Sequence, residues 1–290
     1  MNGRVDAHQH FWRYSPEEFG WIAPDSVLAK SYDPRELQEL LQANGLAESI
    51  VVQARQTDEE TRWLLQLAEE HPWILGVVGW IDLRASDLNE RLDALAAQKK
   101  LLGFRHVVQD EPADFLLDAA FRHGVRGVLQ AGLVYELLVR APQLEHVPAF
   151  LSGVIHDRKA AAIVIDHGGK PAIAEGEWEP WAGRIAAIAR QYPVSCKLSG
   201  LVTEADHGSW NEDEVMRYMR HLLACFGPDR LLFGSDWPVC LLAGSYERVH
   251  ALVQRFIEPL GEAEREAIMG GNARRIYARA DAPVQGETIE

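Results

Sequence analysis

Two histidines separated by one residue stand near the start of the chain, in the segment Val5-Asp6-Ala7-His8-Gln9-His10. The segment is typical of a short β-strand, and strand side chains alternate between two faces with a period of two. His8 and His10 therefore project from the same face. Neutral imidazole is a common metal ligand and the usual acid–base group near pH 7. The spacing indicates a metal centre or a site that polarises a carbonyl, provided that other polar side chains join the pair.

Short apolar runs alternate with amphipathic stretches along the rest of the chain. The apolar runs predict strands at Gly3–His8, Ser49–Ala54, Ile74–Ile81, Leu102–Val107, Leu133–Val139, Ala161–His167, Val194–Leu198 and Arg230–Gly234. The amphipathic stretches predict helices at Pro34–Asn44, Thr57–Glu70, Asp87–Ala97, Asp114–His123, Leu144–Leu151, Glu179–Tyr192, Asn211–Phe226, Tyr246–Leu260 and Ala263–Met269. The segment 125–131 is compatible with either a strand or a helix.

This alternation is typical of an α/β fold, a parallel (β/α)8 TIM barrel of about 250 residues that forms a single domain. The competing architecture is a doubly wound open sheet, which normally carries a glycine-rich phosphate turn after its first strand. Here that turn reads His-Gln-His-Phe-Trp. We therefore expect a barrel over residues 1–280, with 281–290 as a C-terminal tail.

Polar side chains gather where the predicted strands end, and these ends carry the chemistry of such barrels. They are His8, His10, Arg105, Arg140, Asp166, His167, Lys170, Lys197, Ser199 and Asp236. Closure of the barrel brings the first strand beside the eighth, so we expect His8, His10 and Asp236 to converge. His167 should lie across the mouth. Histidines on helices and loops, such as His207, are interpreted as surface residues.

Six segments, in order along most of the chain, resemble the amidohydrolase superfamily. They are Asp6–Trp12, Val78–Leu83, Val164–Pro171, Cys196–Leu201, Phe233–Cys240 and Gly271–Ala273. The Trp-containing and Lys-Leu-Ser pieces are similar to its lactonase branch (amidohydrolase-2), and within that branch to the L-fuconolactonases. The resemblance implies a hydrolase with its site at the carboxyl ends of the barrel strands.

The chain departs from the binuclear members of that superfamily. Those members carry a carboxylated Lys or a Glu after the fourth strand and a His after the fifth. Here the corresponding ends hold Arg105-His106 and Arg140, so a two-metal site is not expected. One divalent ion such as zinc is compatible with a ligand set of His8, His10, His167 and Asp236. Relatives in this branch are also thought to work without metal, and the sequence supports both forms.

The resemblance and the strand ends together predict an enzyme, a lactonase of carbohydrate catabolism. It would open a sugar-acid lactone, similar to L-fuconolactone, to the free acid. Hydrolysis of a lactone needs an activated water, an electrophile for the carbonyl oxygen and a proton for the leaving alkoxide. We expect Asp236 to activate the water as general base. The imidazoles or their metal, helped by Arg105 or Arg140, would stabilise the oxyanion.

Sugar hydroxyls are expected to contact Tyr135, Lys170, Lys197 and Ser199. Trp12, Trp21 and Trp237 are candidates to stack on the sugar ring, although packing against the first loop accounts for each of them better. Three alternatives stay open at this point. A lactonase for a pyrone dicarboxylate would use several mouth arginines, and a metal-dependent decarboxylase could use the same barrel. A sugar-binding protein without catalysis is disfavoured, because a binder has no use for the base Asp236.

Composition limits the partners. The 290 residues include 29 basic and 43 acidic ones, a formal charge of −14, which argues against nucleic acid or an anionic membrane as partner. No apolar run reaches the roughly 18 residues that a membrane span needs. The cysteines, Cys196, Cys225 and Cys240, are widely spaced and indicate a reducing, cytoplasmic environment. We expect a small-molecule substrate, and a homo-oligomer is compatible with these observations.

Overall fold

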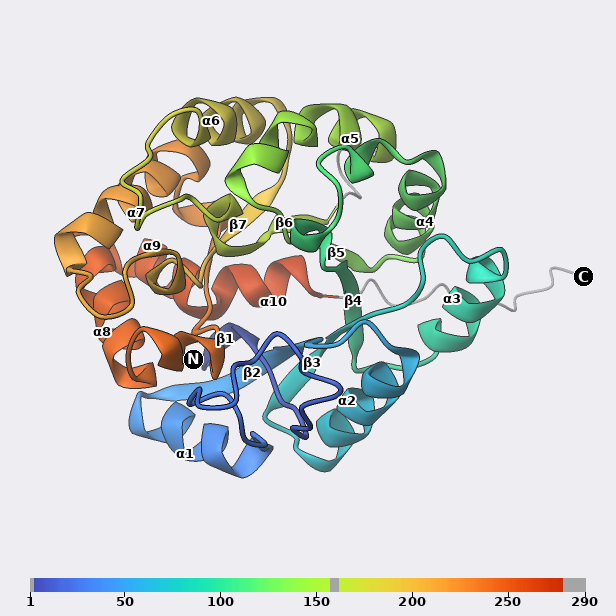
Figure 1. Cartoon of the computed structure of the whole chain (residues 1–290), viewed down its shortest axis with the longest axis horizontal. Coiled ribbons are helices and arrows are strands. Elements are labelled where there is room, and N and C mark those ends of the chain that lie inside the picture. The colour runs from blue at the N-terminus through green and yellow to red at the C-terminus, as the bar shows by residue number, and fades with distance from the viewer. Residues whose placement is uncertain (1–2, 157–161, 279–290) are drawn as a thin grey trace, which may run out of the picture.

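The computed structural model describes residues 3–156 and 162–278, and over these ranges eight parallel strands follow one another around a barrel (Figure 1). The strands are β1 (Arg4–Gln9), β2 (Leu46–Val52), β3 (Ile74–Gly79), β4 (Leu101–His106), β5 (Val134–Leu137), β6 (Ile163–Ile165), β7 (Ser195–Leu198) and β8 (Leu231–Phe233). Each pairs in parallel with the next along the chain. Ala161, expected to begin the sixth strand, and the expected tail 281–290 lie outside the described residues.

The ends of β1 and β8 close the barrel through backbone hydrogen bonds. Asp236 N donates to His8 O at 2.8 Å, and His10 N donates to Trp237 O at 2.7 Å. The predicted (β/α)8 barrel is therefore confirmed. Closure places the loop that follows β8 directly against the end of β1.

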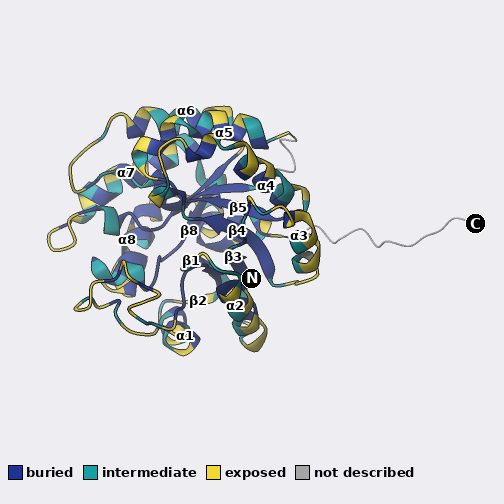
Figure 2. Ribbon diagram, turned by 45° about the vertical axis from the view of Figure 1, so that its right-hand side comes forward, coloured by how far each residue is buried: buried dark blue, intermediate teal, exposed yellow. Residues whose placement is uncertain are grey.

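Helices surround the strands, and Figure 2 shows the buried strands inside a shell whose outer faces are exposed. The helices are α1 (Pro34–Ala43), α2 (Asp58–Glu70), α3 (Leu88–Ala96), α4 (Ala119–Gln130), α5 (Val147–Val154), α6 (Trp181–Gln191), α7 (Glu212–Phe226), α8 (Tyr246–Ile257), α9 (Glu262–Glu266) and α10 (Asn272–Ile276). Side-chain caps from Asp33, Thr57 and Asn211 begin α1, α2 and α7. The segment 125–131, ambiguous in sequence, is helical as far as Gln130.

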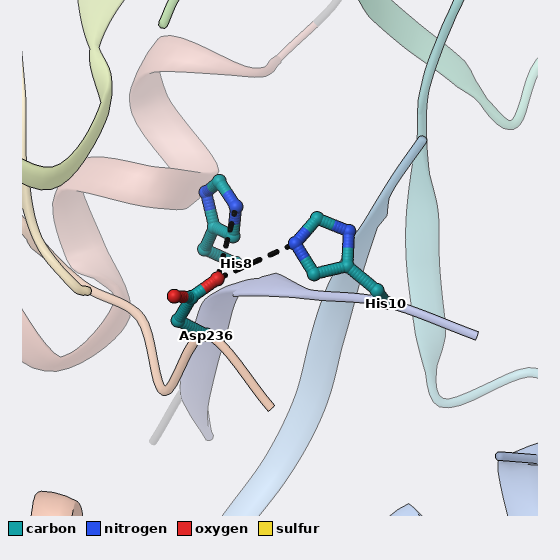
Figure 3. Close-up of side chains that lie close together, drawn as sticks. All are labelled: His8, His10 and Asp236. Carbon is teal, nitrogen blue, oxygen red and sulfur yellow. Dashed lines mark ion pairs between the residues drawn. The ribbon is translucent and has the colours of Figure 1, made fainter. Parts of the chain in front are cut away.

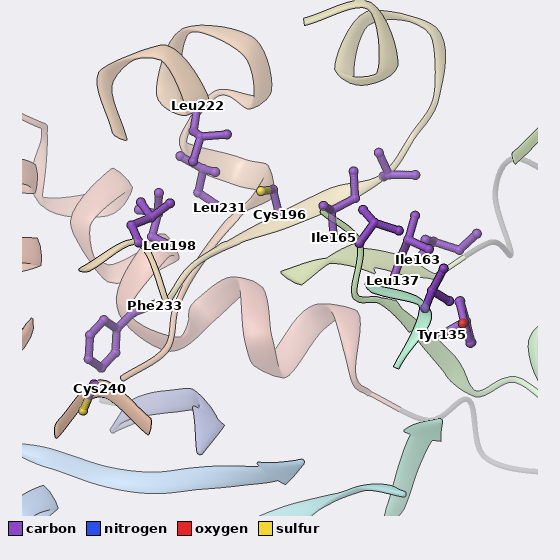
Figure 4. Close-up of a cluster of buried hydrophobic side chains, with 14 of the residues drawn as sticks. Tyr135, Leu137, Ile163, Ile165, Cys196, Leu198, Leu222, Leu231, Phe233 and Cys240 are labelled. Carbon is purple, nitrogen blue, oxygen red and sulfur yellow. The ribbon is translucent and has the colours of Figure 1, made fainter. Parts of the chain in front are cut away.

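The apolar core has two layers. Outward-facing residues of the strands, such as Leu137, Ile165 and Phe233, pack beneath the helices (Figure 4). Inward-facing residues such as Val5 and Val164 fill the barrel, together with residues of the α10 region. In Figure 1, α10 lies across the middle of the ring of strands. It forms the floor of the barrel.

The helix expected at Ala263–Met269 is interrupted. Instead, α9 ends at Glu266 and a π-helical turn leads into α10. The reason lies at Gly270, whose φ is +159° and where a Cβ would come within 2.9 Å of Val5 N. The close approach to β1 therefore bends the chain and needs a glycine at this position.

A buried carboxylate fixes the loop that follows β2. Glu60, in the first turn of α2, accepts hydrogen bonds from Ala54 N at 3.0 Å and Arg55 N at 2.7 Å. Burial raises the pKa of Glu60 to about 7, despite these hydrogen bonds. A raised folded-state pKa stabilises the fold below the unfolded pKa, and that contribution is lost as the pH rises through 7.

We expect Glu60→Gln to remove this pH dependence, because an amide does not ionise. The free energy of unfolding of the wild type should fall relative to that of the variant between pH 4.5 and 7, by on the order of 3 kcal/mol. Urea unfolding at a series of pH values measures the difference. A difference that does not change with pH would contradict the assignment.

Candidate active site

His8, His10 and Asp236 meet at the carboxyl ends of β1 and β8 (Figure 3). Asp236 Oδ1 lies 3.7 Å from His8 Nε2 and 3.4 Å from His10 Nε2. His167, which follows β6, faces the same oxygen with its Nε2 at 4.0 Å. All of these side chains are buried. Residues from both ends of the sequence thus share one site, the arrangement that barrel closure predicts.

A bulge in β1 turns the histidines inward. The pairing of β1 with β2 shifts register after Asp6, so Asp6 faces away from His8 although the two positions share the parity of the strand. Asp6 accepts hydrogen bonds from Ser235 N at 2.9 Å and from Tyr246 Oη at 3.0 Å. This carboxylate therefore holds the β8 loop against β1 and keeps Asp236 beside the histidines.

The backbone is strained where two of these side chains are attached. His167 and Asp236 have φ angles of 54° and 59°, in the left-handed region. Such conformations persist only where the surroundings enforce them, and they cluster at functional sites. Opposite His167, a Cβ at Gly200 would come within 2.4 Å of the His167 Nδ1 atom. Only a glycine at position 200 leaves room for this ring.

Ser199 orients the His167 ring. Its Oγ lies 2.8 Å from His167 Nδ1. Burial lowers the pKa of His167 to about 4, although the charges of Asp236 and Asp166 oppose the shift. The ring is therefore neutral at pH 7. With Nδ1 donating to Ser199, Nε2 presents a lone pair to the site.

Replacing Ser199 by alanine should lower turnover by about tenfold to a hundredfold, because His167 loses the partner that fixes its ring. The measurement is kcat on a lactone, with circular dichroism to verify the fold. Ser152→Ala is the matched control, since Ser152 is a surface serine hydrogen-bonded to Tyr192 Oη, remote from the histidines. Equal turnover in both variants would rule out a role for the Ser199 hydroxyl.

Charged side chains lie below the histidines, in the interior of the barrel. Lys197 Nζ is 2.5 Å from Glu136 Oε1 and 3.3 Å from Asp166 Oδ1. Arg105 donates from Nη1 to Asp166 Oδ2 at 3.1 Å. Tyr277, just after α10, donates a hydrogen bond from its hydroxyl group to Glu136 Oε1. These contacts form a continuous buried network from the floor of the barrel upward.

His8 joins this network to Asp236. Its Nδ1 lies 3.0 Å from Lys197 Nζ and its Nε2 lies 3.1 Å from Arg105 Nη1. Burial and the Lys197 charge lower the pKa of His8 well below its usual value, so the ring is neutral. Burial alone would raise the pKa of Asp166, but Lys197 and His8 outweigh burial and lower it well below its usual value. Asp166 is therefore an anion that balances the cations beside it.

The carboxyl group of Glu136, in the interior of the barrel, and that of Asp236, at its mouth, differ in pKa. Burial and the nearby Asp166 raise the pKa of Glu136 to about 7. Burial would also raise the pKa of Asp236, but the electrostatic effect of the surrounding histidines, that of His167 first, outweighs burial, and this pKa is lowered. Asp236 is thus an ionised carboxylate at neutral pH, close to the neutral imidazoles of His8 and His167, and can accept a proton.

A cavity of about 420 Å³ opens over Asp236 at the mouth of the barrel. Its wall combines indole, amide, imidazole and charged groups, and includes His10, Trp12, Trp21, Arg105, Lys170 and His207. Its volume lies in the range of small-molecule sites. The convergent polar groups are at its base, so a molecule in the cavity can contact Asp236.

The sequence matches the family model described as amidohydrolase over residues 5–279. This chain belongs to the amidohydrolase family. It is 47% identical to an L-fucono-1,5-lactonase of Burkholderia multivorans, over 95% of this chain and 96% of that one. It is 35% identical to an L-fucono-1,5-lactonase of Burkholderia ambifaria, over 98% of both. A crystal structure of an amidohydrolase from Burkholderia multivorans with bound zinc has a TM-score of 0.90 at 45% identity, covering 96% of this chain and 99% of that one.

Some residues predicted to bind substrate lie outside the cavity of this amidohydrolase. Tyr135 packs outward against Phe150, within the cluster of Figure 4, because its position in β5 faces the helices. Lys197 is buried in the interior of the barrel, where its charge is paired. Arg140 is exposed and pairs with Asp110 at 3.3 Å. The structure therefore corrects the sugar contacts predicted for Tyr135 and Lys197, which are fully buried, whereas the contact predicted for Arg140 stays a prediction.

Other predicted residues do line the cavity. Arg105 reaches it from β4, and Lys170 forms part of its wall in an ion pair with Glu204 at 2.9 Å. Trp12 also borders it, but only 1% of this residue is exposed, and its indole N–H donates to Lys30 O at 2.8 Å. Trp12 mainly packs the first loop.

Sequence reasoning missed several residues of the site. His207, interpreted as a surface residue, lies on the cavity wall, as does Gln109. Both belong to loops that follow strands, β7 and β4 respectively, and this position could have identified them. The buried Glu136 and its partner Tyr277 were also missed. The sequence offered a signal only for Glu136, whose position in β5 alternates with Tyr135.

The donor atoms of this amidohydrolase fit a divalent ion. Those of His8, His10 and Asp236 lie within 4.8 Å of one another. His10 Nδ1 is 2.8 Å from Val52 O, which can only accept, so Nδ1 carries a proton and Nε2 presents a lone pair. That lone pair faces Asp236 Oδ1 at 3.4 Å, and both atoms are acceptors. Ligands of tetrahedral zinc are about 3.3 Å apart, from metal–ligand distances near 2 Å.

Within the described ranges, none of the helices has the length and apolar character needed to cross a bilayer.

Proposed function

We propose that this amidohydrolase hydrolyses the lactone of a sugar acid to the free acid. The observation that carries the proposal is the carboxylate of Asp236, held beside His8 and His10 at the base of a small-molecule cavity. The two L-fucono-1,5-lactonases that are similar to this chain support the choice of substrate class. Aldonolactones related to L-fucono-1,5-lactone are therefore the first substrates to test.

Asp236 acts as the general base in this proposal. It takes a proton from water while the water oxygen bonds to the lactone carbonyl carbon. The tetrahedral oxyanion then collapses, the bond from this carbon to the ring oxygen breaks, and Asp236 returns its proton to that oxygen. A carboxylate whose pKa is lowered is ionised when the reaction begins, as this role requires.

Arg105 is the residue we assign to the carbonyl oxygen. Its guanidinium lines the cavity and offers only hydrogen-bond donors. It is held by Asp166 and by Gln53 O, with Nη2 at 2.5 Å from that carbonyl oxygen. Donors held in advance of the reaction stabilise an oxyanion more effectively than water does.

We propose that His8, His10, His167 and Asp236 hold one divalent metal, with zinc as the candidate. The donor atoms of His8, His10 and Asp236 lie close enough together for such an ion, His167 Nε2 is 4.0 Å from Asp236 Oδ1, and the related structure from Burkholderia multivorans contains zinc. When bound, the metal supplies Lewis-acid polarisation of the carbonyl. Metal analysis of the purified protein and activity before and after dialysis against a chelator test this part. Full activity in protein shown to be free of metal would show that the side chains catalyse the reaction without a metal.

The cavity favours a neutral polyhydroxy substrate over a pyrone dicarboxylate. A dicarboxylate needs converging arginines, but Arg55 pairs with Glu18 at 2.9 Å and Arg140 pairs with Asp110. The cavity wall also carries acidic side chains, among them Glu204. Amides and an exposed indole instead suit hydroxyls and the apolar face of a sugar ring.

A panel of aldonolactones followed with a pH indicator tests the substrate class, because ring opening releases an acid. Turnover of aldonolactones but not of 2-pyrone-4,6-dicarboxylate is the expected result. Release of carbon dioxide from an aromatic acid would favour a decarboxylase instead. Stoichiometric binding of a lactone without product would indicate a sugar-binding protein. We further propose that the enzyme acts in the cytoplasm, in keeping with its unpaired cysteines.

A further inference from the structure

The imidazole of His8 lies between two cations. Arg105 Nη1 is 3.1 Å from its Nε2, and Lys197 Nζ is 3.0 Å from its Nδ1. Guanidinium and ammonium groups only donate hydrogen bonds, whereas a neutral imidazole offers a single lone pair. Only one of these two contacts can therefore be a hydrogen bond to the ring.

The surroundings decide which nitrogen accepts. Lys197 has other acceptors, because Glu136 Oε1 lies at 2.5 Å and Asp166 Oδ1 at 3.3 Å. Asp166 Oδ1 also lies 3.4 Å from His8 Nδ1, so a buried anion faces this nitrogen and favours a proton on it. The proton of His8 therefore belongs on Nδ1, and the lone pair of Nε2 accepts from Arg105.

The same Nε2 atom faces Asp236 Oδ1 at 3.7 Å, and His8, His10 and Asp236 form a group that could hold a metal ion. One lone pair cannot accept a hydrogen bond and coordinate an ion at the same time. We infer that Arg105 and a divalent metal compete for His8 Nε2, and that Arg105 is the residue that sets how tightly this site binds metal.

Arg105 can leave His8 without losing its other partners. Its guanidinium also donates to Asp166 Oδ2 at 3.1 Å and to Gln53 O at 2.5 Å, and it borders the cavity. Metal binding would thus release N–H groups of Arg105 toward the cavity. The inference concerns metal affinity and does not depend on which lactone is the substrate.

Equilibrium dialysis against buffered zinc tests the inference on the full-length protein. We expect Arg105→Met to bind zinc at least tenfold more tightly than the wild type, since a competing hydrogen bond and a repelling charge are both removed. Lys170→Met is the matched control. It removes the same charge from the cavity wall, but Lys170 pairs with Glu204 and not with His8. Its zinc affinity should change by less than about threefold, as expected of a screened charge pair.

Unchanged or weaker zinc binding by Arg105→Met would overturn the inference. An equal gain in Lys170→Met would also overturn it, because the effect would then be one of general charge. Circular dichroism establishes that each variant is folded.

A second measurement uses the wild type alone and does not depend on a folded variant. In crystals soaked with zinc, we expect the metal on His8 Nε2 and Arg105 Nη1 beyond 3.5 Å, outside hydrogen-bond distance. Zinc held by His10, His167 and Asp236, with Arg105 still bonded to His8, would refute the competition.

Discussion

Asp236→Asn should lower lactone hydrolysis by roughly 10²–10⁴-fold, the range for loss of a general base. The amide can neither take the proton from water nor return one to the ring oxygen. The loss should appear mainly in kcat, because the cavity wall remains in place to bind the lactone. Initial rates on an aldonolactone, followed with a pH indicator, measure the change.

Asparagine is the informative replacement because of the backbone at this position. Asp236 has a φ of 59°, and asparagine tolerates the left-handed region better than other non-glycine residues do. The variant should therefore fold, with a thermal midpoint close to that of the wild type. Asp93→Asn, which removes the same charge from an exposed position on α3, is the control and should retain full activity. Near-normal turnover in folded Asp236→Asn protein would remove Asp236 from the mechanism.

Lys197→Met should destabilise the fold by about 3–5 kcal/mol, the cost of breaking a buried ion pair on one side. The change leaves Glu136 and Asp166 buried without the ammonium group that lies between them. Methionine preserves most of the volume of the side chain, so a cavity contributes little. Urea unfolding at pH 7 measures the free energy of unfolding.

A double-mutant cycle separates the charge effect from packing. Adding Glu136→Gln to Lys197→Met removes one of the two carboxylates that are left without their ammonium partner. We expect this second change to restore at least about 1 kcal/mol of the free energy of unfolding. Recovery is expected to be partial, because Asp166 still lacks the Lys197 ammonium group and keeps its ion pair with Arg105. Strictly additive effects would show that Lys197 and Glu136 do not interact energetically, and that the contact contributes nothing to stability.

The meeting of His8, His10 and Asp236 followed from the sequence because closure of a parallel barrel is a topological rule. Local rules also located helix starts, such as Pro34, where the structure shows Asp33 as the cap, because capping depends on neighbouring residues alone. Stricter use of strand alternation would have placed Glu136 inside the barrel and Tyr135 outside. The sequence-based assignment of Tyr135 to the cavity was wrong for this reason.

Other features depend on contacts that a sequence pattern does not encode. The shift in register after Asp6 arises from how β1 pairs with β2, so alternation alone misplaces Asp6. The cavity wall is built by long loops, and the positions of Trp21 and His207 depend on how these loops pack. The contact between Tyr277 and Glu136 spans 141 positions and leaves no local signal.

The bond from Ser235 N to the Asp6 carboxylate joins positions 229 residues apart. The ribosome must therefore synthesise most of the polypeptide before β1 can pair with β8. Until β8 has been synthesised, one edge of β1 is unpaired. Its free backbone N–H and C=O groups can then pair with strands of other newly made chains and cause aggregation. Chaperones that shield this edge during synthesis are thus expected to raise the yield of folded protein.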